Sequence, residues 1–212
     1  MAGAKFITIE GGEGAGKSTQ IELLAAALKG AGVSVRSTRE PGGSPGAEQI
    51  RKLLVTGETD RWDPMTEALL HFAARREHLQ NVVRPSLEAG HWVLSDRFAD
   101  STMAYQGYGH GLGREAIEAL YALVLGDFAP DLTLILDLPV ELGLERALAR
   151  RDGEDRYEGF GQAFHERLRA AFHGIAEREP GRCELIDASG DVARVHAAVR
   201  ACVSERLGVA LP

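Results

Sequence analysis

The sequence predicts an α/β fold in which one parallel sheet lies between two layers of helices. Short apolar runs alternate along the chain with longer stretches in which apolar residues recur every three or four positions. The apolar runs are continuous, which is typical of strands buried on both faces of a parallel sheet. A chain of 212 residues is long enough for one well-filled domain, 1–212, and short for two.

The expected elements follow one another in a regular β-then-α order. Strands are expected at Phe6–Ile9, Val33–Val35, Trp92–Leu94, Leu132–Leu136 and Leu185–Ile186. Helices are expected at Ser18–Lys29, Ala47–Leu54, Met65–Ala89, Arg114–Leu125, Glu141–Arg150, Gly161–Glu179 and Val192–Arg206. Two connections rich in glycine, 39–46 and 106–113, are expected as loops, and loops at strand ends commonly carry the site in such sheets.

The first strand leads directly into a phosphate-binding pattern. Residues 11–18 read Gly-Gly-Glu-Gly-Ala-Gly-Lys-Ser, which fits G-x-x-x-x-G-K-[ST]. The glycines let backbone N–H groups turn around phosphate oxygens, while Lys17 supplies a positive charge and the Ser18 hydroxyl can reach a bound Mg²⁺. A helix starting at Ser18 adds the positive end of its dipole. We therefore expect a nucleoside triphosphate to bind at Gly11, Gly12, Glu13, Gly14, Ala15, Gly16, Lys17, Ser18 and Thr19.

Charge and composition exclude several other classes of function. The formal net charge of −7 argues against a general nucleic-acid surface or an anionic membrane surface. No basic-then-apolar opening segment and no apolar stretch of membrane-spanning length occur, so we expect a cytoplasmic protein without a membrane partner. Cys183 and Cys202 form no C-x-x-C pair and are expected to be reduced. The histidines lack the spacing of a transition-metal site.

A polar cluster follows the expected strand Trp92–Leu94. Residues 93–106 read Val-Leu-Ser-Asp-Arg-Phe-Ala-Asp-Ser-Thr-Met-Ala-Tyr-Gln. Asp96 and Arg97 stand at the carboxyl end of a buried strand, beside the phosphate loop, where the carboxylate can organise Mg²⁺ and the guanidinium can clamp an acceptor phosphate. A structural salt bridge is the alternative for this pair. The whole segment closely resembles the signature of thymidylate kinases.

A second segment with the same resemblance follows the expected strand Val33–Val35. Arg39-Glu40-Pro41-Gly42-Gly43 is similar to the R-E-P-G-G segment of that family. The resemblance implies that Arg39 lies near the acceptor phosphate. Arg51 falls where bacterial members carry another arginine that contacts this phosphate. A plain surface charge is the alternative for both residues.

The long expected helix Met65–Ala89 carries a pattern that suits a flat base. Phe72 and Arg76 are four residues apart and therefore share a helix face, where an aromatic ring and a donor fork can hold a pyrimidine. The pair resembles the F-x-x-x-R pair with which the family binds thymine. We expect Phe72 and Arg76 in the base pocket, with Arg75 pointing elsewhere. The alternative places Phe72 in the core and Arg76 in solvent.

The same resemblance implies roles for four further residues. It places Thr102 and Gln106 near the edge of the base, and Tyr105 near the deoxyribose, where its ring can exclude a 2′-hydroxyl. Glu10, at the end of the first strand, is implied to approach the 3′-hydroxyl of the sugar or the Mg²⁺ ion.

The helix pattern of Glu141–Arg150 ends in an arginine-rich segment and breaks at Asp152-Gly153. It resembles the R-A-x-A-R lid of bacterial thymidylate kinases, and we expect a mobile lid over about 146–160. In such enzymes a basic lid accompanies an acidic residue at the loop position that Glu13 occupies. The alternative is a solvated basic helix end favoured by the helix dipole.

The lid resemblance implies a catalytic arginine. Arg150 is expected to stabilise charge on the transferring phosphoryl group, and Arg146, Arg151 and Arg156 are expected to support it on the ATP side. The segment is one residue longer than the family pattern, so the choice between Arg150 and Arg151 stays open. The expected catalytic residues are Lys17, Arg97 and Arg150.

These motifs identify the chain, from Phe6 to about Asp187, as resembling bacterial-type thymidylate kinases. The resemblance implies a three-layer P-loop NTPase fold with a five-stranded parallel sheet and a mobile lid. It implies phosphorylation of dTMP to dTDP with Mg-ATP in dTTP biosynthesis, by a homodimer. Two alternatives stay open, a kinase for another deoxynucleoside monophosphate or deoxynucleoside, and a P-loop switch or binding module.

Overall fold

The computed structural model describes residues 3–149, 156–157 and 159–211. Its centre is a five-stranded sheet in the order β2-β3-β1-β4-β5, and every neighbouring pair of strands is parallel. The predicted parallel sheet is thus confirmed. The strands are β1 (Phe6–Gly11), β2 (Val35–Arg39), β3 (Trp92–Asp96), β4 (Leu132–Asp137) and β5 (Cys183–Asp187).

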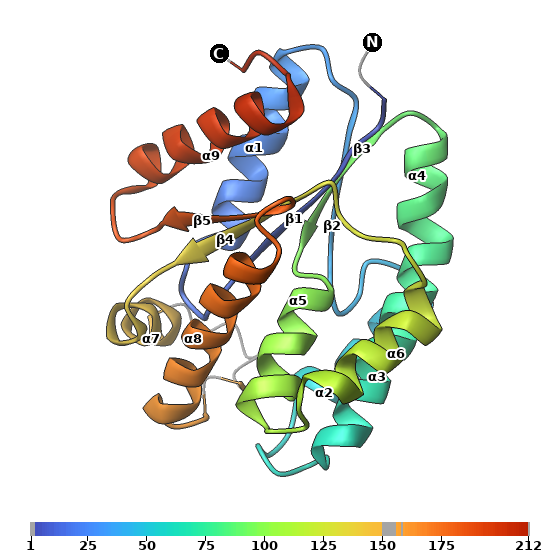
Figure 1. Cartoon of the computed structure of the whole chain (residues 1–212), viewed down its shortest axis with the longest axis vertical. Helices are drawn as coiled ribbons and strands as arrows, with labels where there is room; N and C mark the ends of the chain where they lie inside the picture. The colour runs from blue at the N-terminus through green and yellow to red at the C-terminus, as the bar shows by residue number, and fades with distance from the viewer. Residues whose placement is uncertain (1–2, 150–155, 158, 212) are drawn as a thin grey trace.

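Helices cover both faces of the sheet, which gives the predicted three layers (Figure 1). On one face, α1 (Lys17–Gly30) and α9 (Val192–Leu207) share a core with β1 and β4. On the other face, two further clusters join the remaining layer to the sheet. The elements outside the first layer include α2 (Pro45–Val55), α3 (Pro64–His78), α4 (Arg84–Glu88), α5 (Ala99–Thr102), α6 (Arg114–Leu125), α7 (Val140–Leu148) and α8 (Gln162–Arg178).

The structure differs from the sequence prediction at the edge of the sheet. The second strand was expected at Val33–Val35, but β2 begins at Val35 and ends at Arg39. This strand lies at the edge of the sheet and its residues are half-buried or exposed. A continuous apolar run marks only strands that are buried on both faces, so it could not locate this one.

Two π-helical segments also depart from the prediction. The long helix expected at Met65–Ala89 consists of α3, the π-helix η1 (Leu79–Val83) and α4. Pro85 in the first turn of α4 lacks an N–H group to continue an α-helical ladder, and the π-helix stands just before it. The glycine-rich connection 106–113, expected as a loop, begins inside the π-helix η2 (Met103–Gly109).

The sheet register brings the predicted motifs together at the carboxyl ends of the strands. Ile9 of β1 pairs with Asp96 of β3, and Arg39 of β2 pairs with the same Asp96. The phosphate loop, the loop after β2 and the segment after β3 therefore meet beyond the carboxyl ends of three adjacent strands, where ligands bind in open α/β sheets. Within the described ranges, no helix is both long and apolar enough to cross a membrane.

Candidate active site

A cavity of about 290 Å³ lies beyond these strand ends. Its walls come from the phosphate loop, the loop after β2, and helices α2, α3, α5 and η2, with Tyr157 closing one side. The cavity joins most of the side chains that the sequence assigned to two different nucleotides. The predicted site residues that line it are Glu13, Ala15, Gly16, Lys17, Ser18, Arg39, Arg51, Asp96, Arg97, Thr102, Tyr105 and Gln106.

The phosphate loop has the backbone that its glycines predict. Gly14 and Gly16 have φ angles of 69° and 86°, in the left-handed region that favours glycine. A Cβ on Gly14 would lie 2.0 Å from the carbonyl oxygen of Gly143, so this position has no room for a side chain. Lys17 Nζ donates to the carbonyl oxygens of Gly11 and Gly12 at 3.1 and 2.7 Å. Burial, followed by the positive charge of Arg97, lowers the pKa of Lys17 to about 8.

Ser18 and Asp96 offer oxygen atoms for a hard cation beside this loop. The hydroxyl of Ser18 donates to Asp96 Oδ2 at 2.9 Å, while Asp96 Oδ1 is buried and has no hydrogen-bond partner among the described residues. Carboxylate and hydroxyl oxygens suit a divalent cation that keeps water or phosphate ligands. In the described part of the chain, no three His, Cys, Asp or Glu residues cluster as a metal site. The Ser18 and Asp96 oxygens fit a divalent cation whose other ligands would be water or phosphate oxygens.

Arg97 joins the segment after β3 to the phosphate loop. It has a φ of 67° and is the one non-glycine residue with positive φ in the described ranges. Its guanidinium donates to the Gly11 carbonyl at 3.1 Å, to Ser101 Oγ at 3.2 Å and to Glu13 Oε1 at 2.9 Å. A backbone held in this sparse region places the guanidinium at the cavity wall.

Glu13 stays ionised in this setting. Burial would raise its pKa, but the charges of Arg97 and Lys17 and a hydrogen bond from Tyr105 lower it to about 2. The Tyr105 hydroxyl donates to Glu13 Oε1 at 2.6 Å. Glu13 therefore anchors Arg97 and Tyr105, two residues that the sequence assigned to the acceptor nucleotide.

Glu10 is not where the resemblance implied. Its side chain is fully buried and is absent from the cavity wall. Oε1 accepts a hydrogen bond from the Phe98 N–H at 2.6 Å, and Oε2 accepts one from the Ser101 hydroxyl at 2.5 Å. Burial, followed by the negative charge of Asp100, raises the pKa of Glu10 to about 7. Glu10 thus fixes the start of α5 instead of facing the sugar or a metal ion.

Helix α3 presents a different face to the cavity from the one predicted. His71 and Arg75 line the cavity, whereas Phe72 is buried in the core and Arg76 is exposed. Arg76 Nη1 donates to the carbonyl oxygen of Val124 on α6 at 3.2 Å, outside the cavity wall. The placement of Phe72 and Arg76 in the base pocket was therefore wrong. His71-x-x-x-Arg75 has the same four-residue spacing and was the signal that could have been recognised.

Arg75 presents one unused donor. Its Nε donates to Glu40 Oε2 at 2.7 Å, and its Nη2 donates to the Phe98 carbonyl and to Thr102 Oγ1, both at 3.0 Å. Nη1 is buried and has no partner among the described residues. Three hydrogen bonds therefore fix the orientation of the Arg75 guanidinium, and its Nη1 can still donate.

Gln106 presents the complementary unused acceptor. Its Nε2 donates to Glu67 Oε1 at 2.6 Å, which leaves Oε1 buried and without a partner in the described chain. Gln106 and Arg75 both line the cavity. Because an unpaired buried polar group is costly, these two free atoms are well suited to bond a ligand in the cavity.

His71 and Tyr157 form an aromatic side of the cavity. The His71 Nε2 lies 3.0 Å from the Tyr157 hydroxyl, which itself donates to Glu67 Oε1 at 3.0 Å. The hydroxyl therefore accepts from His71, whose Nε2 carries the hydrogen. Burial lowers the pKa of His71 to about 3, so the ring is neutral at physiological pH.

Arg156 lies against the connection between α2 and α3, although it was predicted to support ATP. Its guanidinium donates to the carbonyl oxygens of Leu54, Glu58 and Thr59 at 3.1, 3.0 and 3.0 Å. It also forms an ion pair with Glu67 Oε2 at 2.6 Å, in which both side chains are buried. Its donors are occupied by the α2–α3 connection, so the ATP assignment of Arg156 was wrong.

The remaining arginines divide into two groups. Arg39 Nη2 bonds both carboxylate oxygens of Glu48 at 3.1 Å, and Arg51 Nη1 donates to the Pro41 carbonyl at 2.6 Å, and both arginines line the cavity. Arg146 Nη1 donates to the Ala188 carbonyl at 3.3 Å, away from the cavity wall. Thr19 is an exposed residue of α1. The predicted lid residues Arg150 and Arg151 lie outside the described residues.

Known proteins are similar to this chain in both sequence and fold. The family model described as thymidylate kinase matches residues 9–199. A thymidylate kinase of Caulobacter vibrioides is 59% identical over 204 residues, which cover 96% of this chain and 98% of the relative. One from Afipia carboxidovorans is 50% identical over 98% of this chain and 92% of its own length. The crystal structure of thymidylate kinase from Ehrlichia chaffeensis has a TM-score of 0.77 at 38% identity, covering 95% of this chain and 99% of that chain.

The family match runs from β1 into α9 and so includes every residue of the cavity wall. Identity above 50% over nearly the full length of both chains extends well beyond any one motif. The chain belongs to the thymidylate kinase family.

Proposed function

We propose how the described residues divide the work of the family's reaction, in which ATP and dTMP give ADP and dTDP. Phosphoryl transfer needs little covalent chemistry from the protein, so the work is to position two anions and to neutralise charge on the moving group. The phosphate loop holds ATP, and the cavity holds dTMP. One domain, 1–212, carries both halves of the site.

The thymine base is proposed to bind between Arg75 and Gln106. Thymine presents O4 as an acceptor and N3–H as a donor on neighbouring atoms, and these match the free Nη1 of Arg75 and the free Oε1 of Gln106. Cytosine presents an amino donor where thymine has O4, so it would leave Arg75 without an acceptor. This pair of unused buried atoms is the observation that carries the proposal. The ring of His71 provides a flat neutral surface beside it.

The phosphates are proposed to bind along the other wall. Lys17 and the amides of the 11–19 loop hold the phosphates of ATP, and Arg39, Arg51 and Arg97 hold the phosphate of dTMP. Guanidinium groups suit this role because their forked donors match phosphate oxygens. Tyr105, which bonds Glu13 at the cavity wall, faces the deoxyribose. Thr102 acts through Arg75, to which its hydroxyl is bonded.

A divalent cation is proposed to complete the donor half. Ser18 and Asp96 would hold Mg²⁺, which adds positive charge beside the ATP phosphates. The unpartnered Oδ1 of Asp96 supports this assignment. The hydrogen bond from the Ser18 hydroxyl to Asp96 Oδ2 holds these two side chains together, and both would bind the cation.

The segment after α7 is proposed to supply the last charge. By the family resemblance, Arg150 stabilises the transferring phosphoryl group, with Arg146 and Arg151 supporting it. Exclusion of water by this segment would prevent hydrolysis of ATP in place of transfer.

We also propose a homodimer located in the cytoplasm. Met65 and Leu69 on α3 are 39% and 50% exposed, and Leu123 on α6 is 82% exposed. Helices α3 and α6 pack against each other, and exposed apolar side chains on neighbouring helices are typical of a protein interface. These residues support a dimer through the α3 and α6 layer.

Initial rates with different acceptors test the proposed function. ADP release and dTDP formation are measured with dTMP, dUMP, dCMP, dGMP and thymidine at fixed Mg-ATP. The kcat/KM for dTMP should exceed that for dCMP by about a hundredfold or more, since a site built for hydrogen bonding rejects the wrong donor pattern. Slow ATP hydrolysis that dTMP leaves unchanged would instead indicate a switch or binding module.

A further inference from the structure

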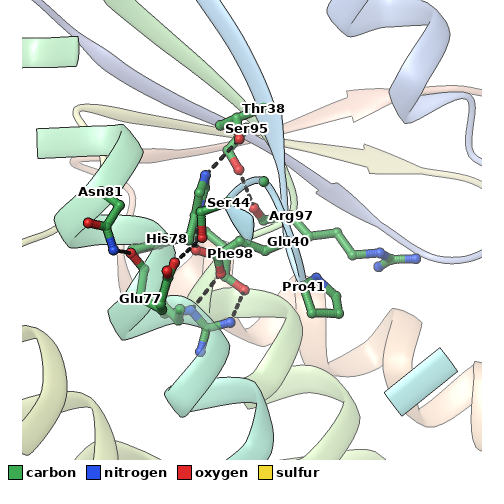
Figure 2. A network of polar contacts seen from close by, with 12 residues as sticks. Thr38, Glu40, Pro41, Ser44, Glu77, His78, Asn81, Ser95, Arg97 and Phe98 are labelled. Atoms are coloured by element: carbon green, nitrogen blue, oxygen red, sulfur yellow. Dashed lines mark hydrogen bonds and ion pairs between the residues drawn. The ribbon is translucent and has the colours of Figure 1, made fainter. Parts of the chain in front are cut away.

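A series of buried polar contacts connects the base pocket to the loop after β2. Nε of Arg75 donates to Glu40 Oε2 at 2.7 Å. The Nδ1 of His78 lies 2.9 Å from Glu40 Oε1, and the Nε2 of His78 lies 2.6 Å from Thr38 Oγ1. Figure 2 shows the ring of His78 between Thr38 and Glu40. These four residues are called the polar series below.

The bond between His78 and Glu40 has a defined direction. Glu40 is ion-paired with Arg75, and an ionised carboxylate accepts only, so His78 Nδ1 carries a hydrogen and donates it. The Thr38 hydroxyl can donate or accept, so it can bond Nε2 at the other end of the ring. Arg75, Glu40 and His78 are 2%, 4% and 0% exposed, so water does not compete for these bonds.

The loop after β2 is packed directly on the same histidine. Gly43 has a φ of 86°, and a Cβ at this position would lie 2.6 Å from His78 Nε2 and 2.5 Å from Thr38 Oγ1. This loop also contains the Pro41 carbonyl, which accepts a hydrogen bond from Arg51. His78 therefore contacts both Glu40, which bonds Arg75, and the loop that begins after Arg39 and bonds Arg51 through the Pro41 carbonyl.

We propose that His78 is a positioning residue for the acceptor nucleotide, holding the guanidinium of Arg75 and the 39–43 loop in one fixed arrangement through Glu40 and Thr38. The proposal rests on the proposed function of Arg75 as the group that reads the base. Glu40 fixes the plane of the Arg75 guanidinium through one carboxylate oxygen, and His78 fixes the orientation of that carboxylate through the other. A guanidinium held in advance loses little freedom when the base arrives, which favours binding.

Two substitutions of His78 itself test the positioning role. His78→Phe keeps a ring and loses both hydrogen bonds, and it should raise the KM for dTMP about tenfold while the KM for ATP and the kcat stay within about twofold. The kcat/KM ratio of dTMP over dCMP should fall with it. His78→Asn retains a donor near Glu40 and should recover part of the dTMP affinity.

Thr38 provides the matched pair of variants. Thr38→Val removes the hydroxyl at nearly constant shape and should raise the KM for dTMP, whereas Thr38→Ser keeps the hydroxyl and should restore it. His91→Phe serves as the control, because it removes another contact between a histidine and a hydroxyl, His91 Nδ1 to Ser34 Oγ at 2.5 Å, away from the cavity wall. Its kinetic constants should equal those of the wild type.

The contrary outcomes are distinct from a failure of the proposed function. A folded His78→Phe protein with an unchanged KM for dTMP overturns the positioning role, and so does an equal rise in KM for both nucleotides. If His78→Phe does not fold, equal KM values for Thr38→Val and Thr38→Ser overturn it. Arg75→Lys with wild-type dTMP affinity refutes the base assignment itself. If Arg75→Lys weakens dTMP binding and the His78 and Thr38 variants do not, only the positioning role fails.

Discussion

At Glu10, burial outweighs three interactions that favour a charged carboxylate. The Phe98 N–H, the Ser101 hydroxyl and the charge of Arg97 all stabilise the ionised form, yet the pKa is raised to about 7. Desolvation is the largest cause, and the negative charge of Asp100 adds to it. The residue therefore makes folding depend on pH, although it does not line the cavity.

Glu10→Gln should remove this pH dependence. Unfolded Glu10 has the ordinary pKa of 4.5, so between pH 4.5 and about 7 the folded protein retains a proton that the unfolded chain loses. Wild-type stability therefore falls as pH rises through this window, by about 3 kcal/mol at most, and the neutral amide does not share the fall. Urea unfolding of both proteins at pH 5 and pH 8 measures the difference. If the unfolding free energies of wild type and Glu10→Gln differ by the same amount at pH 5 and at pH 8, Glu10 is not the source of the pH dependence.

The choice between Arg150 and Arg151 is also decided at the scale of single residues. Arg150→Ala should lower kcat by about two to four powers of ten with little change in dTMP binding, which is the range of arginine effects in phosphoryl transfer. Arg151→Ala should have a much smaller effect on kcat. Steady-state kinetics of the two variants makes the comparison, and a wild-type kcat in Arg150→Ala would reject this arginine as the catalytic one.

At the scale of elements, the face of a helix decides which side chains meet the substrate. The sequence predicted α3 and its four-residue spacing correctly, but two overlapping pairs, His71/Arg75 and Phe72/Arg76, both fit that spacing. A rotation of about 100° separates their faces, and only the packing of α3 against α6 and the sheet selects one. The F-x-x-x-R resemblance favoured Phe72, but a phenylalanine ring suits the core that it occupies as well as it suits a base.

The loop after β2 is a second element whose conformation matters. Gly43→Ala should be destabilising by about 1–3 kcal/mol from backbone strain alone, and more because its Cβ would meet Thr38 and His78. Gly32→Ala is the matched control, since Gly32 has a φ of 79° and open space around it. The KM for dTMP should rise only in Gly43→Ala. A rise of equal size in both variants would show that strain, not contact with His78, is responsible.

At the scale of the whole molecule, local spacing predicted the elements and tertiary packing supplied the orientation of side chains. The phosphate loop, Asp96 and Arg97 lie at the strand ends where their sequence context placed them, because the connection from a strand to its loop is encoded within a few residues. Arg156 and Glu10 were misplaced because their partners, Glu67 and Ser101, come from distant segments. The net charge of −7 also does not predict that four arginines line one cavity, namely Arg39, Arg51, Arg75 and Arg97.

We infer that thymine binds through Arg75, which lines the cavity, and not through its neighbour Arg76, which bonds Val124 outside the cavity wall. Calorimetric titration of dTMP into the wild type, Arg75→Lys and Arg76→Lys tests it most directly. Lysine at position 75 keeps a positive charge beside Glu40 but cannot bond both Glu40 and the base, so its dTMP affinity should fall about ten- to hundredfold. Arg76→Lys should bind dTMP as the wild type does. Unchanged binding by Arg75→Lys, or weakened binding by Arg76→Lys alone, would contradict the account.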